Sequence, residues 1–112
     1  MFLVAPSDAG VRVEPQRLAD ASIDVEAVRL TMWQAAWRLA SGSAAATEVA
    51  TAKFWAAEAG HRVAHTAVHV HGGMGIDTSY PVHRYFTAAK HHEFALGGAT
   101  AQLLRIGADL AR

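Results

Sequence analysis

Seven histidines are the residues of this 112-residue chain most able to do chemistry. His61, His65 and His69 recur at every fourth position, which places them on one face of a helix. A di-iron helical bundle needs two Glu-x-x-His motifs, and only Glu58 with His61 forms one. The zinc-protease motif His-Glu-x-x-His is absent from the sequence. We therefore expect no metal site and interpret this histidine row as a polar helix face.

The run His91-His92-Glu93 is a second group of titratable residues. Neighbouring residues of a helix point about 100° apart, so these three side chains cannot converge on one reacting atom. The chain has no cysteine, which excludes disulfides, thiol catalysis, iron–sulfur clusters and thiolate zinc sites. We expect neither an acid–base site at this run nor a Ser/His/Asp set, since no spacing in the sequence suggests one.

The glycine-rich segment Gly72-Gly73-Met74-Gly75 is a candidate for phosphate binding. Backbone N–H groups of such a turn can approach a phosphate closely. The segment is not a dinucleotide-binding fingerprint, because a helix rather than a strand precedes it. By itself it is explained equally well as a helix stop, and Gly97-Gly98 is a break of the same kind.

Four helical segments must position these groups. Alanine, the best helix former, occupies 25 positions, and prolines and glycines divide the chain into four stretches. The stretches run from Pro15 to about Leu39, from 44–47 to His71, from 80–81 to just before Gly97, and from Ala99 to about Leu110. The sequence predicts an all-α, four-helix up-down bundle over residues 15–112, preceded by an irregular arm at 1–14.

The first predicted helix is apolar on two sides. One stripe, the inner stripe, consists of Leu18, Ala21, Val25, Val28, Met32, Ala35 and Leu39. A second, the outer stripe, consists of Ile23, Leu30, Trp33 and Trp37. A helix that is apolar on two sides is expected to be covered on both. This much apolar surface indicates either a generous core or a bundle that packs against partner subunits, and we favour the partner subunits.

The composition argues against several classes of partner. Ten Lys and Arg against ten Asp and Glu give a formal charge of zero, and the pI is near 7.1. This balance argues against binding to nucleic acid or to an anionic membrane. No stretch approaches the roughly 20 apolar residues of a membrane span, and the opening five residues are too short for a signal peptide. We expect a cytoplasmic protein.

Five segments, in this order and spacing, resemble the C-terminal helical domain of acyl-CoA dehydrogenases over about residues 16–112. They are LAD at 18–20, ATAKFWAAE at 50–58, AVHVHGGMGI at 67–76, YPVHRYF at 80–86 and LGGATAQ at 96–102. The resemblance implies a flavoenzyme with an N-terminal helical domain, a middle β-domain and this tetramerising bundle. It also implies α,β-dehydrogenation of an acyl-CoA thioester, in which a carboxylate removes the α-proton and FAD, held partly across a subunit interface, accepts the β-hydride.

The resemblance carries over to individual residues only in part. Gly72 and Gly73 match the family's turn at the FAD pyrophosphate, and His69 takes the place of a preceding Gln. A histidine can still donate one hydrogen bond there. The family's catalytic Glu falls on Gly97, which has no proton acceptor, and Glu93 lies a helical turn earlier. The resemblance therefore implies FAD contacts at His69, Gly72 and Gly73 and assigns no catalytic residue to this chain.

Three interpretations remain open. In the first, the chain supplies the interface and FAD contacts of a dehydrogenase, and another chain supplies the base. The Gly-Gly-Ala-Thr turn looks like that of heteromeric actinobacterial sterol-degrading members, which suggests a bulky CoA ester. In the second, the chain is a catalytically inactive, truncated homologue that only self-associates. In the third, it is an unrelated helical interaction module or a metal-binding module that uses His61, His65 and His69.

Overall fold

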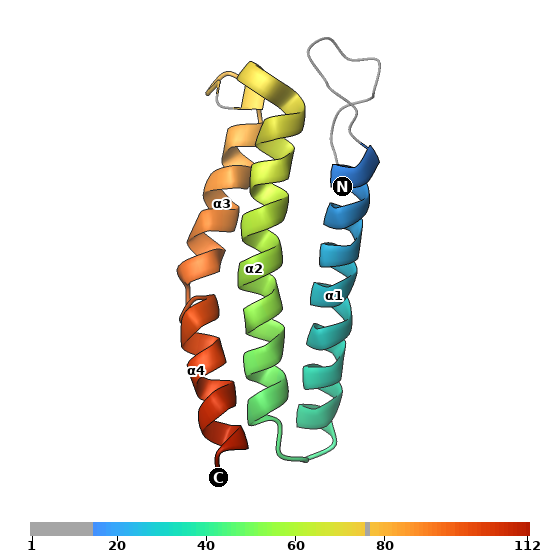
Figure 1. The fold of residues 1–112 in the computed structure, drawn as a ribbon, viewed down its shortest axis with the longest axis vertical. Coiled ribbons are helices and arrows are strands. Elements are labelled where there is room, and N and C mark those ends of the chain that lie inside the picture. Colours follow the sequence, from blue (N-terminus) through green and yellow to red (C-terminus); the bar gives the residue numbers. More distant parts are fainter. Residues whose placement is uncertain (1–14, 76) are drawn as a thin grey trace.

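The computed structural model of the chain describes residues 15–75 and 77–112, which form four α-helices and a short 3₁₀ turn (Figure 1). The elements are α1 (Pro15–Ala40), α2 (Ala46–His71), η1 (Gly72–Gly75), α3 (Val82–Phe94) and α4 (Ala99–Leu110). Each helix begins and ends close to its predicted bound, because prolines and glycines stand at those points. The all-α class is confirmed. The predicted arm at 1–14 lies outside the described residues and stays a prediction.

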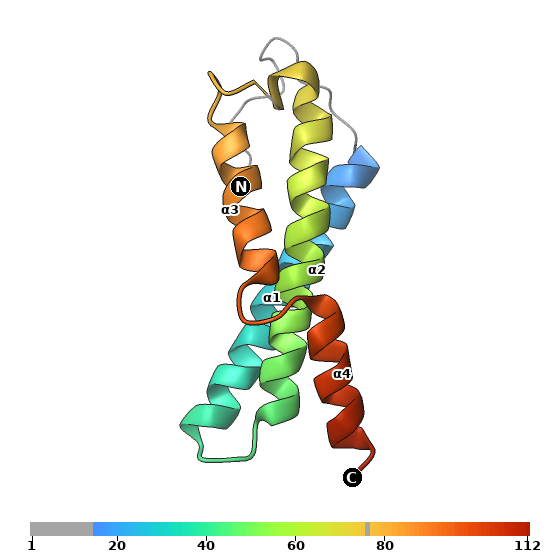
Figure 2. The same cartoon turned by 90° about the vertical axis from the view of Figure 1, so that its left-hand side faces the viewer.

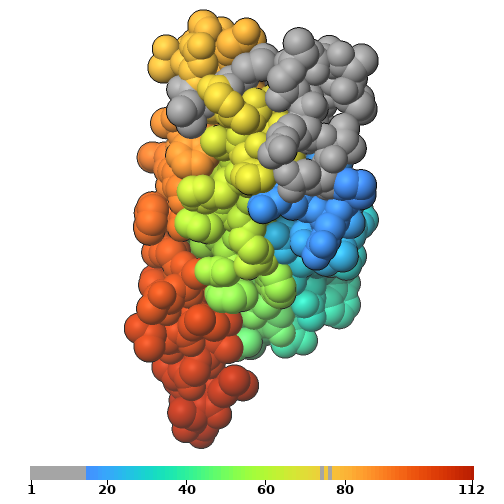
Figure 3. All heavy atoms as spheres, turned by 45° about the horizontal axis from the view of Figure 1, so that its top comes forward, coloured from blue at the N-terminus to red at the C-terminus, as the bar shows by residue number. Residues whose placement is uncertain are grey.

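Helix α2 lies at the centre of the molecule. It runs antiparallel to α1 on one side and contacts α3 and α4 on the other (Figures 1 and 2). Helix α3 lies along the second half of α2, and α4 continues in the same direction along the first half (Figure 2). Helices α1, α2 and α3 therefore alternate in direction, as predicted for an up-down bundle. Helix α4 instead runs in the same direction as α3 and follows it end to end. The resulting molecule is elongated, 53 × 22 × 20 Å, with α1 and the α3–α4 column on opposite sides of α2 (Figure 3).

The core between these helices is built mainly from alanines. Its buried apolar residues are Ala21, Ala35, Ala45, Ala50, Ala57, Ala59, Ala64 and Val70. Because alanine carries only a methyl group, the helix axes can approach closely along α2. The larger apolar side chains are consequently left outside this core. Of the helices described, none is long and apolar enough to cross a membrane.

The two apolar stripes of α1 have different surroundings. In the inner stripe, Ala21 and Ala35 are buried, although Met32 and Leu39 at its margin remain exposed. The outer stripe is exposed throughout, with Trp33 at 60% and Trp37 at 66% of full accessibility. The rest of the described chain thus covers one apolar side of α1 and leaves the other open.

Candidate functional site

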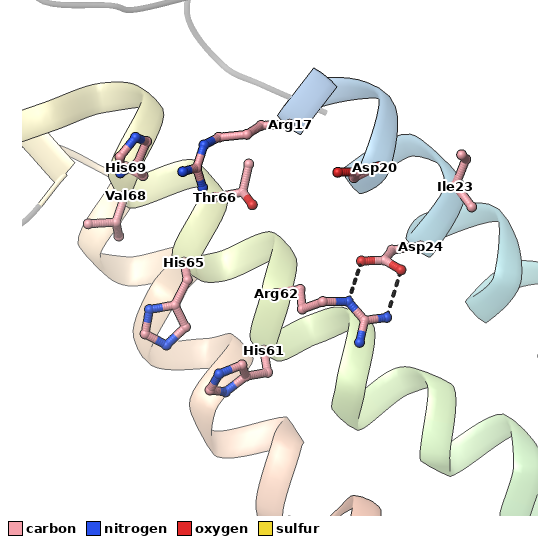
Figure 4. Close-up of a pocket in the computed structure, with 10 residues that line it drawn as sticks. All are labelled: Arg17, Asp20, Ile23, Asp24, His61, Arg62, His65, Thr66, Val68 and His69. Carbon is pink, nitrogen blue, oxygen red and sulfur yellow. Dashed lines mark hydrogen bonds and ion pairs between the residues drawn. The ribbon is translucent and has the colours of Figure 1, made fainter. Parts of the chain in front are cut away.

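A cavity of about 790 Å³ lies between the first half of α1 and the second half of α2 (Figure 4). Its lining combines charged, histidine and apolar side chains: Arg17, Asp20, Ile23 and Asp24 of α1 with His61, Arg62, His65, Thr66, Val68 and His69 of α2. Arg17 reaches across from α1 toward the part of α2 that carries Thr66 and His69 (Figure 4). The predicted FAD contact His69 therefore lies in a cavity with an arginine on the facing helix.

An ion pair joins the two helices within this cavity. Arg62 donates from Nε and Nη2 to the two carboxylate oxygens of Asp24 at 2.9 and 2.7 Å (Figure 4). The hydrogen bonds to Asp24 raise the pKa of the Arg62 guanidinium. Asp24 is only 8% exposed, so the fold buries this carboxylate between the two helices. A bidentate pair of this kind fixes the spacing and register of α1 and α2.

The histidine row on α2 does not surround a common point. His61 and His65 point toward α3, and their ring centroids lie 4.5 Å apart (Figure 4). The Nδ1 atom of His61 lies 3.2 Å from Glu93 Oε1, and the His65 ring packs edge-on against Phe86. Burial, together with the charges of Lys90 and His61, lowers the pKa of His65. In the described ranges, no three His, Asp or Glu side chains are arranged to hold a metal ion.

Glu93, the carboxylate nearest in sequence to the family's base position, is part of this helix contact. Burial raises the pKa of Glu93, but hydrogen bonds from Lys90 and His61 outweigh it, so the pKa lies below its ordinary value. Lys90 Nζ lies 3.0 Å from Glu93 Oε2. The residue is thus held as an ionised partner between α2 and α3, which is a structural role.

The glycine turn after α2 contains two kinds of glycine. Gly72 has a left-handed φ of 60° and donates its N–H to His69 O, and both Gly72 and Gly73 are exposed. Gly75, in contrast, is buried, and a Cβ there would lie 2.7 Å from Val68 O. Gly75 therefore lets the turn fold back onto α2, while the outer side of Gly73 is open space. The predicted pair Gly72 and Gly73 is the part of the turn that a phosphate can reach.

Gly97, at the family's base position, lies in the turn between α3 and α4 (Figure 1). Its φ is +92°, and the preceding Leu96 also has a left-handed φ of 60°. A Cβ added at Gly97 would lie 3.1 Å from Gln102 Nε2 and 3.2 Å from Ala101 Cβ. This turn lies beside the middle of α2 on the side away from α1. The structure therefore does not bring Gly97 together with His69, Gly72 and Gly73 within one copy of the chain.

Comparison with known proteins gives the family. Residues 13–111 match the family described as "Acyl-CoA dehydrogenase, C-terminal domain". The chain is 67% identical over 104 residues to "Acyl-CoA dehydrogenase FadE27" of Mycobacterium tuberculosis. That match covers 86% of this chain and 28% of the relative.

Two solved structures have the same fold. A chain of the ChsE4–ChsE5 complex from Mycobacterium tuberculosis is 70% identical with a TM-score of 0.83, covering 87% of this chain and 26% of that one. A variant of the Tcur3481–Tcur3483 steroid ACAD is 43% identical with a TM-score of 0.81, covering 86% of this chain and 27% of that one. The chain therefore spans about a quarter of the length of these relatives. It belongs to the acyl-CoA dehydrogenase family, a family of oxidoreductases, and corresponds to the C-terminal helical domain.

Proposed function

We propose that the chain is the C-terminal part of a cytoplasmic, FAD-dependent acyl-CoA dehydrogenase assembled from two kinds of subunit. It contributes contacts to FAD and an oligomer interface, and another chain supplies the catalytic base. The observation that carries this proposal is Gly97. The position has no proton acceptor, and its left-handed φ and the tight approach of Gln102 would strain any side chain placed there.

The similar solved structures support a heteromeric assembly. The first is named as the ChsE4–ChsE5 complex, and the second carries two protein names and is named as a steroid ACAD. By this likeness, the substrate is a bulky, steroid-type acyl-CoA thioester that is oxidised between its α and β carbons. The glycine at position 97 is consistent with a second subunit that carries the base.

The residues around the end of α2 fit the pyrophosphate part of FAD. His69 has a ring that can donate a hydrogen bond, Gly72 and Gly73 are exposed, and Arg17 brings positive charge to the same cavity. When bound, FAD accepts the hydride that leaves the β carbon of the acyl-CoA. In our proposal His69 and Arg17 bind and orient the cofactor, which is shared with a neighbouring subunit.

The outer stripe of α1 supports the proposed interface. Its four large residues lie on one exposed helix face, and the exposed Leu103, Leu104 and Leu110 of α4 form a separate apolar surface on the other side of α2 (Figure 1). Contiguous apolar surface of this kind is typical of protein–protein contacts. The sequence predicts that α1 is covered on both of its apolar sides. A partner subunit that packs on the outer stripe would cover the second side.

The second candidate function is that of an inactive homologue that only self-associates. The exposed stripe favours it equally, because self-association would also cover this face. The two candidates differ in whether the assembly retains flavin. A metal-binding module is less consistent with the structure, since the Nδ1 of His61 already contacts Glu93 and Lys90.

A visible absorption spectrum separates the two functions. The chain is incubated with FAD, alone and together with a full-length acyl-CoA dehydrogenase subunit, and excess cofactor is removed. We expect flavin bands to be retained in the mixed assembly. His69→Ala should weaken retention, and His69→Gln, which restores the family's residue, should preserve it. His83→Ala, on α3, is the matched control. A colourless assembly of both chains would contradict the enzymatic function and favour the inactive homologue.

A further inference from the structure

The turn between α3 and α4 holds a leucine in a conformation that leucine disfavours. Leu96 has a φ of 60°, and it is the one non-glycine residue with a positive φ among the residues described. Such a conformation costs free energy for a residue with a Cβ and persists only where the surroundings enforce it. The Leu96 side chain is 86% exposed, so its own packing cannot be what enforces the turn.

Gln102 on α4 supplies the enforcing contacts. It is 1% exposed and is the largest fully buried side chain in the described structure. Its Nε2 donates to the carbonyl oxygens of Leu96 and Gly97 at 3.1 and 3.0 Å, and its Oε1 accepts a hydrogen bond from Arg105 at 3.2 Å. Both polar atoms of the carboxamide therefore form hydrogen bonds, and its two N–H groups both donate to the two residues with a left-handed φ.

The turn is also held from the opposite side by α2. Lys53 Nζ donates to the carbonyl oxygens of His92 and Glu93 at 2.9 and 3.1 Å, which satisfies the last turn of α3. Gly97 completes the arrangement, because a Cβ there would lie 3.1 Å from Gln102 Nε2. A side chain at position 97 would therefore press against the carboxamide and would also be strained by the left-handed φ.

We propose that Gln102 is the positioning residue of the α3–α4 turn and that it holds the backbone of Leu96 and Gly97 in the left-handed conformation. This inference rests on the proposed function, in which position 97 takes the place of the family's catalytic base and another chain supplies that base. Gln102 is buried behind the turn, so it acts on a substrate only through the backbone of Leu96 and Gly97. It sets the shape of the space left where other family members carry a base.

A double-mutant cycle tests whether Gln102 enforces the turn. Gln102→Met keeps the shape and removes both donors, and we expect the folding equilibrium constant to fall about 10-fold. In a Leu96→Gly background the loss should grow to about 30-fold, because glycine adopts a positive φ freely and the turn then has no strain to release when the donors are lost. In a Leu96→Ala background it should remain about 10-fold, because alanine shortens the side chain without relieving the backbone. Equal losses in the glycine and alanine backgrounds would overturn the proposal.

Amide hydrogen exchange adds a readout that general destabilisation cannot produce. The Gly97 N–H donates to Phe94 O in this turn, and the Gly72 N–H donates to His69 O in the other glycine turn. Gln102→Met should accelerate exchange at Gly97 at least about 10-fold more than at Gly72. Equal acceleration at both amides would show a global effect and contradict a positioning role.

Two further points keep the test decisive. If Gln102→Met does not fold, Arg105→Ala removes the hydrogen bond to the same carboxamide, and the same coupling with Leu96→Gly is expected at smaller size. All these measurements use the chain without FAD or a partner. The absorption spectrum of the mixed assembly tests the proposed function separately. If the Gln102 and Leu96 variants are coupled but the assembly retains no flavin, the role of Gln102 is upheld and the proposed function is overturned. If the assembly retains flavin but the variants are not coupled, the proposed function is upheld and the role of Gln102 is overturned.

Discussion

The inner and outer stripes of α1 lie on the same helix but have opposite character. The inner stripe buries small residues, Ala21 and Ala35, against α2, whereas the outer stripe exposes Trp33 and Trp37. Burial of large apolar side chains is normally the main favourable term in folding. That α1 buries the methyl groups of Ala21 and Ala35 and leaves Trp33 and Trp37 in solvent indicates two separate uses. The inner stripe determines the fold, and the outer stripe is available for assembly.

The largest effect on stability is expected from enlarging the inner stripe. Ala21 is 2% exposed, so Ala21→Leu adds three carbons to a contact that has no space for them. We expect the free energy of unfolding to fall by about 1–3 kcal/mol, measured by chemical denaturation. A loss under about 0.5 kcal/mol would mean that α1 and α2 are not closely packed at this position.

A somewhat smaller loss is expected when the ion pair beside the inner stripe is broken. Asp24→Ala removes the two Asp24 oxygens that accept from the Arg62 guanidinium, which is itself about half exposed and keeps its hydrogen bond to Glu58. Because solvent can rehydrate the arginine, we expect a loss of about 1–2 kcal/mol. Asp20→Ala, one turn earlier on a more exposed part of α1, serves as the control. Equal effects of the two variants would contradict a specific role of the buried pair.

The contact between α2 and α3 should make the stability of the fold depend on pH in the acid range. The pKa of Glu93 is lowered in the folded chain, so the unfolded chain takes up the proton first. The stabilising contribution is complete above the unfolded value of 4.5 and is lost as the pH falls through the lower folded pKa. Thermal unfolding between neutral and acid pH should show a loss in this window that Glu93→Gln reduces. An unchanged profile in Glu93→Gln would count against this assignment.

The smallest effect on stability is expected from the outer stripe. Leu30→Ala removes a side chain that is 59% exposed, and we expect the free energy of unfolding of the isolated chain to change by less than about 0.5 kcal/mol. The comparison with Ala21→Leu is informative because both changes lie on one helix. A loss above about 1 kcal/mol for Leu30→Ala would show that the outer stripe contributes to the fold after all.

The sequence predicts the local features of this fold well. Pro15, Ser41-Gly42-Ser43 and Gly97-Gly98 mark helix ends because their effects on the backbone are local. The period of apolar residues also separates the two stripes of α1, since helical geometry alone places them on different faces. The end-to-end order of α3 and α4 was not predicted, because it depends on packing along α2 rather than on either helix.

The candidate site was predicted less completely. His69, Gly72 and Gly73 are predicted from the resemblance and stay a prediction, whereas the sequence assigns no role to Asp24, Lys53 or Gln102. Asp24 and Gln102 are polar residues that the fold buries, and their partners lie on another helix or across a turn. No local pattern signals such contacts. For Gln102, the glycine pair five residues earlier shows that a turn lies nearby but does not identify what holds it.

Sedimentation velocity, followed both at the protein wavelength and at the flavin wavelength, tests the central claim most directly. The chain is mixed with FAD and a full-length partner subunit, and it is compared with a Trp33→Ser, Trp37→Ser double variant. We predict one larger species that carries flavin, and a variant that sediments alone without flavin although it unfolds like the parent chain. If the double variant assembles and retains flavin as the parent does, the outer stripe is not the interface and the account is wrong.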